Sequence, residues 1–254
     1  MAYHEKLIIS GNRIELYKFE ALVKSKPKWK KKKPRVVKRR TREQIIEQIK
    51  NHEESNFNIE LTRSSSLRRT KSRITRLINS NSDMRTFITL TFKDNITDLF
   101  QANDIFKKFI KRLKRKFPQL KYLAVPEFQK DTDYYGNVKP NGGSVHYHLL
   151  VNIDYLDNGK LAKIWKQGFV MINKVRHINN LGLYISKYIC KDLFDIRYFG
   201  MRKILLSRNL DQPLIFTAYK GVMNFLDKSK LKLLYESKYL SDWLGKVYYQ
   251  LYAS

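Results

Sequence analysis

The order of two hydrophobic periodicities constrains the fold of this chain more than any other feature. Apolar and polar residues alternate with period two, as in half-buried strands, in residues 87–92, 122–128, 145–151 and 169–175. Apolar residues recur at helical spacing in three further segments, which begin at Asn103 or Asp104, at Gly159, and at Asn179 or Asn180. The resulting order (strand, helix, strand, strand, helix, strand, helix) predicts an α+β domain, an antiparallel sheet with helices on one face.

Two histidines share one face of the predicted strand 145–151. Alternate side chains of a strand point the same way, so His146 and His148 lie together while the residues beside them point into apolar packing. Two neutral imidazoles side by side form half of a divalent-metal site. Glu127, at the end of the preceding strand, is the expected third ligand. Gln129 is the substitute on the same face, because an amide oxygen is a weaker donor to a hard cation.

Two tyrosines and two lysines form a stripe on the last predicted helix. Residues three and four apart lie on one helical face, which groups Tyr184, Lys187, Tyr188 and Lys191. A phenol is a weak nucleophile at neutral pH because its ordinary pKa is about 10, and nearby ammonium groups favour the phenolate. The stripe predicts nucleophilic tyrosines, although a tyrosine is more often a core residue with its hydroxyl at the surface.

Together, the histidine and tyrosine motifs resemble the HUH endonuclease superfamily, and more narrowly the two-tyrosine rolling-circle replication initiators (Rep) of small phages and plasmids. The resemblance covers residues 84–212 and continues in Phe87–Phe92, Ile164–Gly168 and Ser207–Leu210. It implies a ferredoxin-like antiparallel sheet of about five strands with helices packed on it.

The resemblance also implies an activity. The expected protein is a metal-dependent, site-specific single-strand DNA endonuclease and strand transferase that nicks the origin, forms a 5′-phosphotyrosine intermediate and rejoins the strand at termination. The expected site comprises the catalytic residues Tyr184, Tyr188 and Lys187, the Mg or Mn ligands His146, His148 and Glu127, and the DNA-binding residues Lys191, Thr89, Thr91 and Arg208.

The formal net charge of +28, from 51 Lys and Arg against 23 Asp and Glu, indicates a nucleic-acid partner. Phosphate attraction does not distinguish DNA from RNA, so a non-enzymatic basic nucleic-acid-binding protein stays open as an alternative. A transposase or relaxase with the same nucleophile is a second alternative. The expected partners are single-stranded or hairpin origin DNA, a host helicase and a polymerase, since the sequence has no P-loop.

Accessory regions are predicted on both sides of the catalytic domain. Residues 1–83 are predicted to form a basic arm with a hairpin around Gly11-Asn12, twelve basic residues between Lys24 and Arg42, and two helices. Residues 213–254 are predicted as a helical appendage, because Leu, Tyr and Trp recur at roughly helical intervals. A single cysteine, Cys190, and the lack of a secretory signal or membrane span predict a cytoplasmic protein of a bacterial host cell.

Overall fold

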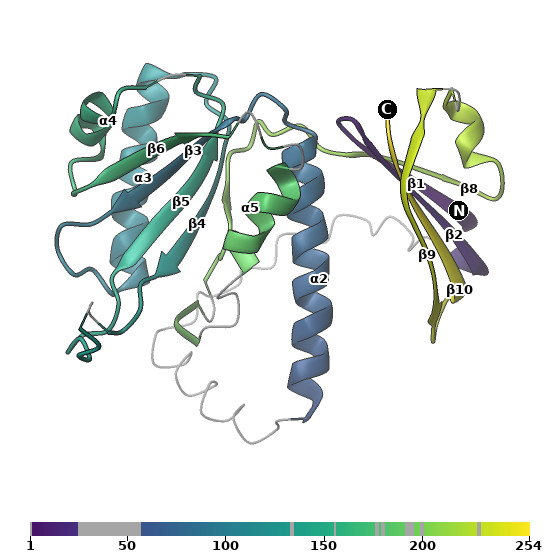
Figure 1. The fold of residues 1–254 in the computed structure, drawn as a ribbon, viewed down its shortest axis with the longest axis horizontal. Helices are drawn as coiled ribbons and strands as arrows, with labels where there is room; N and C mark the ends of the chain where they lie inside the picture. Colours follow the sequence, from purple (N-terminus) through teal and green to yellow (C-terminus); the bar gives the residue numbers. More distant parts are fainter. Residues whose placement is uncertain are drawn as a thin grey trace, which may run out of the picture. The chain divides into compact units, whose positions relative to one another are not determined.

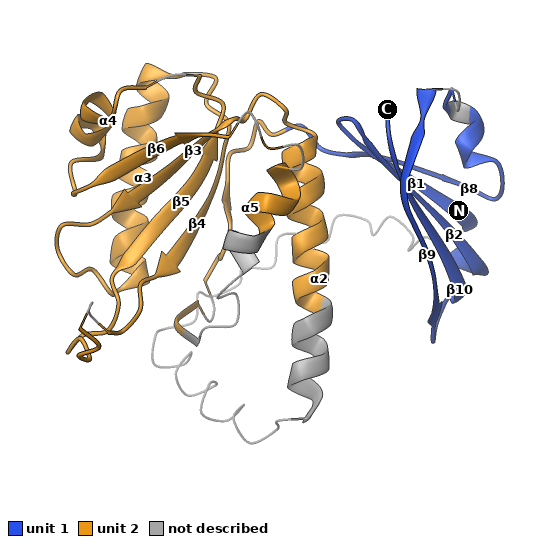
Figure 2. Ribbon diagram, in the orientation of Figure 1, with its two compact units in different colours: residues 1–41, 211–254 blue, residues 42–210 orange. Residues whose placement is uncertain are grey.

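The computed structural model describes residues 2–24, 57–132, 135–154, 156–175, 178, 181–190, 196–198, 201–227 and 230–254. Only the backbone is described for residues 57–65, 187–190 and 225. The chain divides into two compact units, one of residues 1–41 and 211–254 and the other of residues 42–210 (Figure 2). Each unit is described by itself.

The unit of residues 42–210 is built on a five-stranded sheet with the order β6-β3-β5-β4-β7, in which all neighbours are antiparallel. Its strands are β3 (Thr86–Thr91), β4 (Tyr122–Phe128), β5 (Val145–Val151), β6 (Val170–Lys174) and β7 (Leu205–Leu206). The predicted α+β class and the four predicted strands are confirmed, and the predicted bounds of β4 and β5 match those of the structure.

Helices cover both faces of this sheet, so the prediction of helices on one face was wrong. The described helices are α2 (Phe57–Asn79), α3 (Leu99–Lys116), α4 (Asn158–Trp165) and α5 (Leu181–Cys190) (Figure 1). The helices α3 and α4 pack against Ile88, Leu90 and Tyr147, whereas α2 and α5 pack against Phe87 and Leu150. Because β3 and β5 carry apolar side chains on both faces, both faces need a cover.

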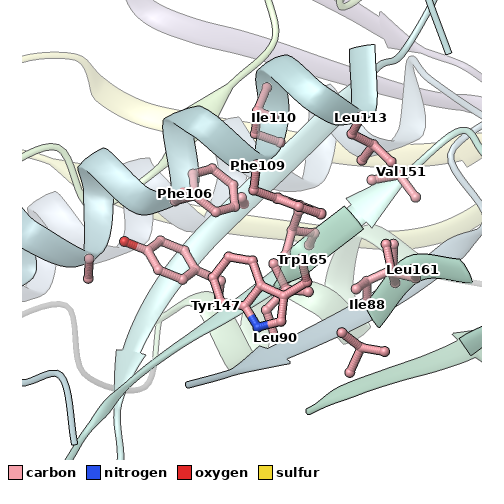
Figure 3. Close-up of a cluster of buried hydrophobic side chains, with 14 of the residues drawn as sticks. Ile88, Leu90, Phe106, Phe109, Ile110, Leu113, Tyr147, Val151, Leu161 and Trp165 are labelled. Atoms are coloured by element: carbon pink, nitrogen blue, oxygen red, sulfur yellow. The ribbon is translucent and has the colours of Figure 1, made fainter. Parts of the chain in front are cut away.

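The core between the sheet and α3 fixes the orientation of β5. The Tyr147 ring stacks on Phe106 with 4.4 Å between centroids, and its hydroxyl donates to Asn103 Oδ1 at 2.9 Å (Figure 3). Burial raises the pKa of the Tyr147 phenol, so this hydroxyl stays a proton donor. With Tyr147 held in this core, His146 and His148 must point to the opposite face.

The start of α3 differs from the prediction. Its N-cap is Asp98, whose carboxylate accepts from the Phe100 backbone N–H at 2.8 Å. Asn103 was a predicted cap, but it lies inside the helix and is the buried acceptor for the Tyr147 hydroxyl. A short polar side chain favours a cap and also satisfies a buried hydroxyl, so local pattern does not separate the two roles.

The helices α2 and α5 lie side by side and approach closely at Gly182 (Figure 1). A Cβ atom at Gly182 would lie 2.8 Å from the Thr75 carbonyl oxygen and 2.8 Å from Asn79 Oδ1. Real Cβ atoms do not approach a backbone oxygen so closely, so a larger residue would push α5 away from α2.

We expect Gly182→Ala to destabilise the protein by about 1–3 kcal/mol, because overpacking outweighs the gain of about 1 kcal/mol from better helix propensity. Urea unfolding measures the change in free energy. Leu183→Ala is the matched control on the same helix, since Leu183 is exposed, and its effect should stay within about 0.5 kcal/mol. A stabilised Gly182→Ala protein would contradict the close helix contact.

The unit of residues 1–41 and 211–254 contains a second antiparallel sheet, with the order β8-β1-β2-β10-β9. Its strands are β1 (Ala2–Ser10), β2 (Arg13–Lys24), β8 (Leu214–Ala218), β9 (Lys232–Ser241) and β10 (Gly245–Ala253). The predicted hairpin is confirmed: Gly11 has φ 57° between β1 and β2, which pair through Ser10 and Arg13.

The predicted helical appendage at residues 213–254 was wrong, because this segment forms β8, β9, β10 and the short 3₁₀-helix η2 (Val222–Phe225). Tyrosine and valine favour strands, and Gly245, with φ 65°, closes the β9–β10 hairpin. The pairing of β10 with β2 joins the two ends of the chain in one sheet, so these ends are not the separate accessory parts of the predicted division at residues 83 and 212.

Two predicted features of the N-terminal region, a helix beginning near Arg42 and most of the basic segment, lie outside the described residues. None of the helices in the described ranges has both the length and the apolar character needed to span a bilayer.

Candidate active site

Strand register brings the predicted metal ligands to one face of the sheet. Glu127 on β4 lies opposite His146 on β5, and Thr91 on β3 lies opposite His146 from the other side. Thr89 lies opposite His148 in the same way. Directly opposite residues of antiparallel strands project to the same face, so these five side chains share the face away from α3.

The imidazole of His148 is held on three sides. Its Nε2 lies 2.6 Å from Glu127 Oε2, and its Nδ1 lies 3.1 Å from Thr89 Oγ1. The Phe87 ring stacks on it with 5.6 Å between centroids and 9° between planes. This hydroxyl can donate to Nδ1 or accept from it, so Thr89 can satisfy either neutral tautomer of the ring.

His146 has a different environment. Its Nε2 is buried and has no hydrogen-bond partner in the described structure. Burial lowers the pKa of His146 below its ordinary value of 6.5, and the adjacent His148 lowers it further. A buried neutral imidazole with an unpaired nitrogen has a lone pair available to a cation.

The donor set suits a divalent cation, although its present geometry is closed. Among the described residues, no group of three or more His, Cys, Asp or Glu side chains is arranged to hold a metal ion. Ligand atoms about 2.1 Å from an ion and at right angles are roughly 3 Å apart, so the 2.6 Å hydrogen bond between His148 and Glu127 must lengthen. The orphaned nitrogen of His146 and the neighbouring carboxylate of Glu127 nevertheless fit such an ion.

We expect Thr89→Val to weaken Mn binding by about 10–100-fold, because the hydroxyl that fixes the His148 tautomer is lost while the side-chain shape is kept. Titration calorimetry or Mn electron paramagnetic resonance measures the affinity. Thr91→Val on the same strand and face is the matched control for metal binding. Equal Mn affinity for the wild type and Thr89→Val would contradict a role of this hydroxyl at the site.

The lowered pKa of His146 predicts a pH dependence of stability. Below pH 6.5 the unfolded chain binds a proton at His146 that the folded chain resists, so the free energy of unfolding falls as the pH drops through 6.5 towards the folded pKa. His146→Asn should remove this contribution. Urea unfolding of both proteins between about pH 8 and 5 tests it, and parallel stability curves would contradict the burial of this ring.

The tyrosine helix packs on the same face of the sheet as the histidines. Ile185 of α5 is 1% exposed and belongs to the cluster that contains Phe87 and Leu150. Tyr184 is 37% exposed, as expected for a residue on the polar stripe of the helix. The side chains of Lys187 and Tyr188, and the whole of Lys191, lie outside the described part of the chain.

The segment Ser207–Leu210 is a turn that follows β7. The Ser207 hydroxyl accepts from the Tyr122 backbone N–H at 3.0 Å, and Leu210 is buried in the cluster beneath α2 and α5. Only Arg208 of these three residues has an exposed side chain. Ser207 and Leu210 therefore fix the turn, and Arg208 is the residue oriented towards a ligand in solution.

Sequence reasoning missed the anchor that follows α5. Within η1 (Ile196–Tyr198), the Tyr198 hydroxyl donates to the Pro126 carbonyl at 2.8 Å, next to Glu127. Arg197 pairs with Asp131 at 3.1 Å and lies over the Phe128 ring at 3.9 Å. These contacts tie the chain beyond the tyrosine helix to the strand of Glu127. No local pattern indicates them, because Tyr198 and Pro126 are 72 residues apart.

The unit of residues 42–210 is thus an α+β domain with two imidazoles and a carboxylate on the sheet face that also carries a tyrosine helix. Residues 85–193 match the phage-type family described as replication-associated protein ORF2. The match begins just before β3 and runs past α5, so it includes all the strands and the helix that carry the predicted ligands and tyrosines. Comparisons with curated proteins and with solved structures found no match.

Proposed function

We propose that the chain initiates rolling-circle DNA replication as a site-specific, metal-dependent single-strand endonuclease and strand transferase. One observation carries the proposal: the segment similar to replication-associated proteins contains the His–Glu cluster and, on the same sheet face, the tyrosine helix. The substrate is single-stranded or hairpin origin DNA, and a host helicase and a polymerase act with the protein.

The sheet order supports a ferredoxin-like domain. The elements β3, α3, β4, β5, α4 and β6 follow in this sequence, and their strands lie in the order β6-β3-β5-β4. We infer from this order a split βαβ arrangement, in which β5 lies between β3 and β4. Such an arrangement puts the histidine strand in the middle of the sheet and Glu127 on its neighbour.

The reaction exchanges one phosphodiester for another. The phenolic oxygen of Tyr184 or Tyr188 forms a bond to the scissile phosphorus as the bond from phosphorus to the 3′ oxygen breaks. The phenol loses a proton and the 3′ oxygen gains one, which leaves a 5′-phosphotyrosine and a free 3′ hydroxyl. The bond is conserved, so a second tyrosine can later cut the regenerated junction while the first strand end is still attached, and the ends can be rejoined.

The residues of the site have distinct roles in this reaction. His146, His148 and Glu127 would hold Mg or Mn, whose chemistry when bound is to withdraw charge from a non-bridging phosphate oxygen. Lys187 neutralises the phosphate or favours the phenolate. Thr89 orients His148 through its 3.1 Å contact, and Thr91, Lys191 and Arg208 contact the DNA backbone.

The test uses overlapping single-stranded oligonucleotides from the replicon that encodes the chain, each labelled at either end. With Mn, the 3′-labelled strand should become attached to the protein and survive denaturation, while the 5′-labelled fragment is released. With chelator, neither product should form. Cleavage without attachment would indicate attack by water, and binding without cleavage would leave a non-enzymatic nucleic-acid-binding protein.

A further inference from the structure

One face of the sheet in the unit of residues 1–41 and 211–254 carries a row of five aromatic rings, which we call the aromatic row. Its members are Tyr3, Phe19, Tyr17, Tyr249 and Tyr235, from β1, β2, β10 and β9. Neighbouring ring centroids lie 6.1 Å apart for Tyr3 and Phe19, 6.1 Å for Phe19 and Tyr17, 4.9 Å for Tyr17 and Tyr249, and 6.2 Å for Tyr249 and Tyr235. The row therefore crosses four strands without a break.

The aromatic row and the core of this unit occupy opposite faces of the sheet. Leu7, Ile14 and Leu16 form the core with Val222 of η2. On β2 these core residues alternate with Tyr17, so the rings project from the other face. Tyr235 is 56% exposed, and the other four rings are partly exposed.

The charge around the row suits an anionic ligand. Lys6 lies opposite Tyr17 on β1, and Arg13 lies on the same face of β2. Glu15, the acidic residue between Arg13 and Tyr17 on this face, is only 9% exposed and accepts from the Tyr17 hydroxyl at 2.8 Å. The strand β2 ends at Lys24, where the sequence continues into twelve Lys and Arg residues within residues 24–42.

We propose that the aromatic row is a second binding surface, which takes single-stranded DNA by stacking unpaired bases on its rings. Every base has a flat face, so a row of rings binds single strands with little sequence preference, while Lys and Arg attract the phosphates. A duplex does not fit, because its bases are already stacked on each other. The choice of DNA over RNA rests on the proposed function, whereas the stacking surface itself rests on the geometry of the rings.

A surface of this kind is useful to an enzyme that cuts one strand. The tyrosine site binds a short segment around the scissile phosphate, and the aromatic row would bind a further stretch of the same kind of strand without regard to its sequence. We therefore expect the row to determine affinity for long single strands and not the choice of cleavage site.

The experiment measures binding of the full chain to fluorescein-labelled oligothymidylate of about 20 nucleotides in the presence of chelator, so that nicking plays no part. The double variant Tyr235→Ala/Tyr249→Ala should bind about tenfold or more weakly. Tyr235→Phe/Tyr249→Phe should bind like the wild type, because the rings remain. Tyr248→Ala is the matched control, since Tyr248 projects from the opposite face of β10 and is exposed.

Equal affinity of the double alanine variant and the wild type would overturn the proposal. An equal loss for Tyr248→Ala, or a loss of the same size for a duplex of the same length, would also overturn it, because stacking on this face would then not be the cause. Thermal unfolding of each variant shows whether the sheet is intact, and the phenylalanine pair gives a folded comparison if the alanine pair is unstable. Since nicking is not measured, failure here leaves the proposed nuclease untouched.

Discussion

Replacing both Tyr184 and Tyr188 by phenylalanine is expected to lower covalent attachment to DNA by about a thousandfold or more, because no phenolic oxygen remains on α5 to attack the phosphate. Gel analysis of the 3′-labelled adduct measures this loss. Affinity for the uncleaved strand and its salt dependence should change little, since the phenol hydroxyls carry no charge at neutral pH. Tyr135→Phe is the matched control in the same unit, because Tyr135 is 85% exposed and lies outside the site.

The single variants sharpen this expectation. If the two tyrosines alternate, Tyr184→Phe and Tyr188→Phe should each retain one cleavage step but lose the exchange of one strand end for another. Residual adduct in the double variant would assign the nucleophile to another residue. A parallel loss of DNA binding would instead give the two phenols a structural role in α5.

The second large effect is expected from the imidazoles. His146→Gln/His148→Gln should lower metal-dependent cleavage by about a hundredfold or more, because the cation loses both nitrogen donors. Cleavage rates measured over a range of Mn concentrations separate weaker metal binding from a slower reaction at saturation. His4→Gln is the control, since His4 lies in the other unit, where its Nδ1 is 3.0 Å from the Phe19 carbonyl.

Glu127→Gln adds a separate readout. The amide keeps the shape and can still bond to His148, but it is a poorer donor to Mg or Mn. We expect weaker Mn binding with nearly unchanged stability. Full cleavage by the histidine double variant at low Mn concentration would contradict a metal role for this face of the sheet.

Period-two alternation was sufficient to predict the central part of the sheet. Alternation in residues 145–151 fixed both the strand and the face of His146 and His148, since Tyr147 and Leu149 between and beyond them are fully buried in the structure. Glu127 was placed correctly next to the histidines because the connection between β4 and β5 pairs the two strands in register. These inferences needed only local periodicity and the pairing of consecutive strands.

Features that depend on distant parts of the chain could not be read in this way. The C-terminal segment was assigned as helix because its Leu, Tyr and Trp spacing fits a helix, yet β10 completes a sheet with β2, more than 220 residues earlier for Val247 and Phe19. The second face of the catalytic sheet was missed because Phe87 and Leu150 were not recognised as a core for α2 and α5. Neither pairing leaves a signal in its own segment.

Part of the site was also assigned a different role. Thr89 was predicted to contact DNA, and the structure gives its hydroxyl a partner at His148 Nδ1. The anchoring of Tyr198 on Pro126 had no sequence signal, since a tyrosine hydroxyl bonded to a backbone carbonyl depends on chain geometry alone.

Mass spectrometry of the covalent product tests the central claim most directly, because trypsin cuts after Lys187 and separates the two tyrosines. After reaction with the origin strand and nuclease trimming, a nucleotide should be found on the peptide of residues 177–187, on that of residues 188–191, or on both. Its attachment should require Mn and the His146 and His148 side chains. A nucleotide on any other peptide, or metal-dependent cleavage with no modified peptide, would contradict attack by a tyrosine of α5.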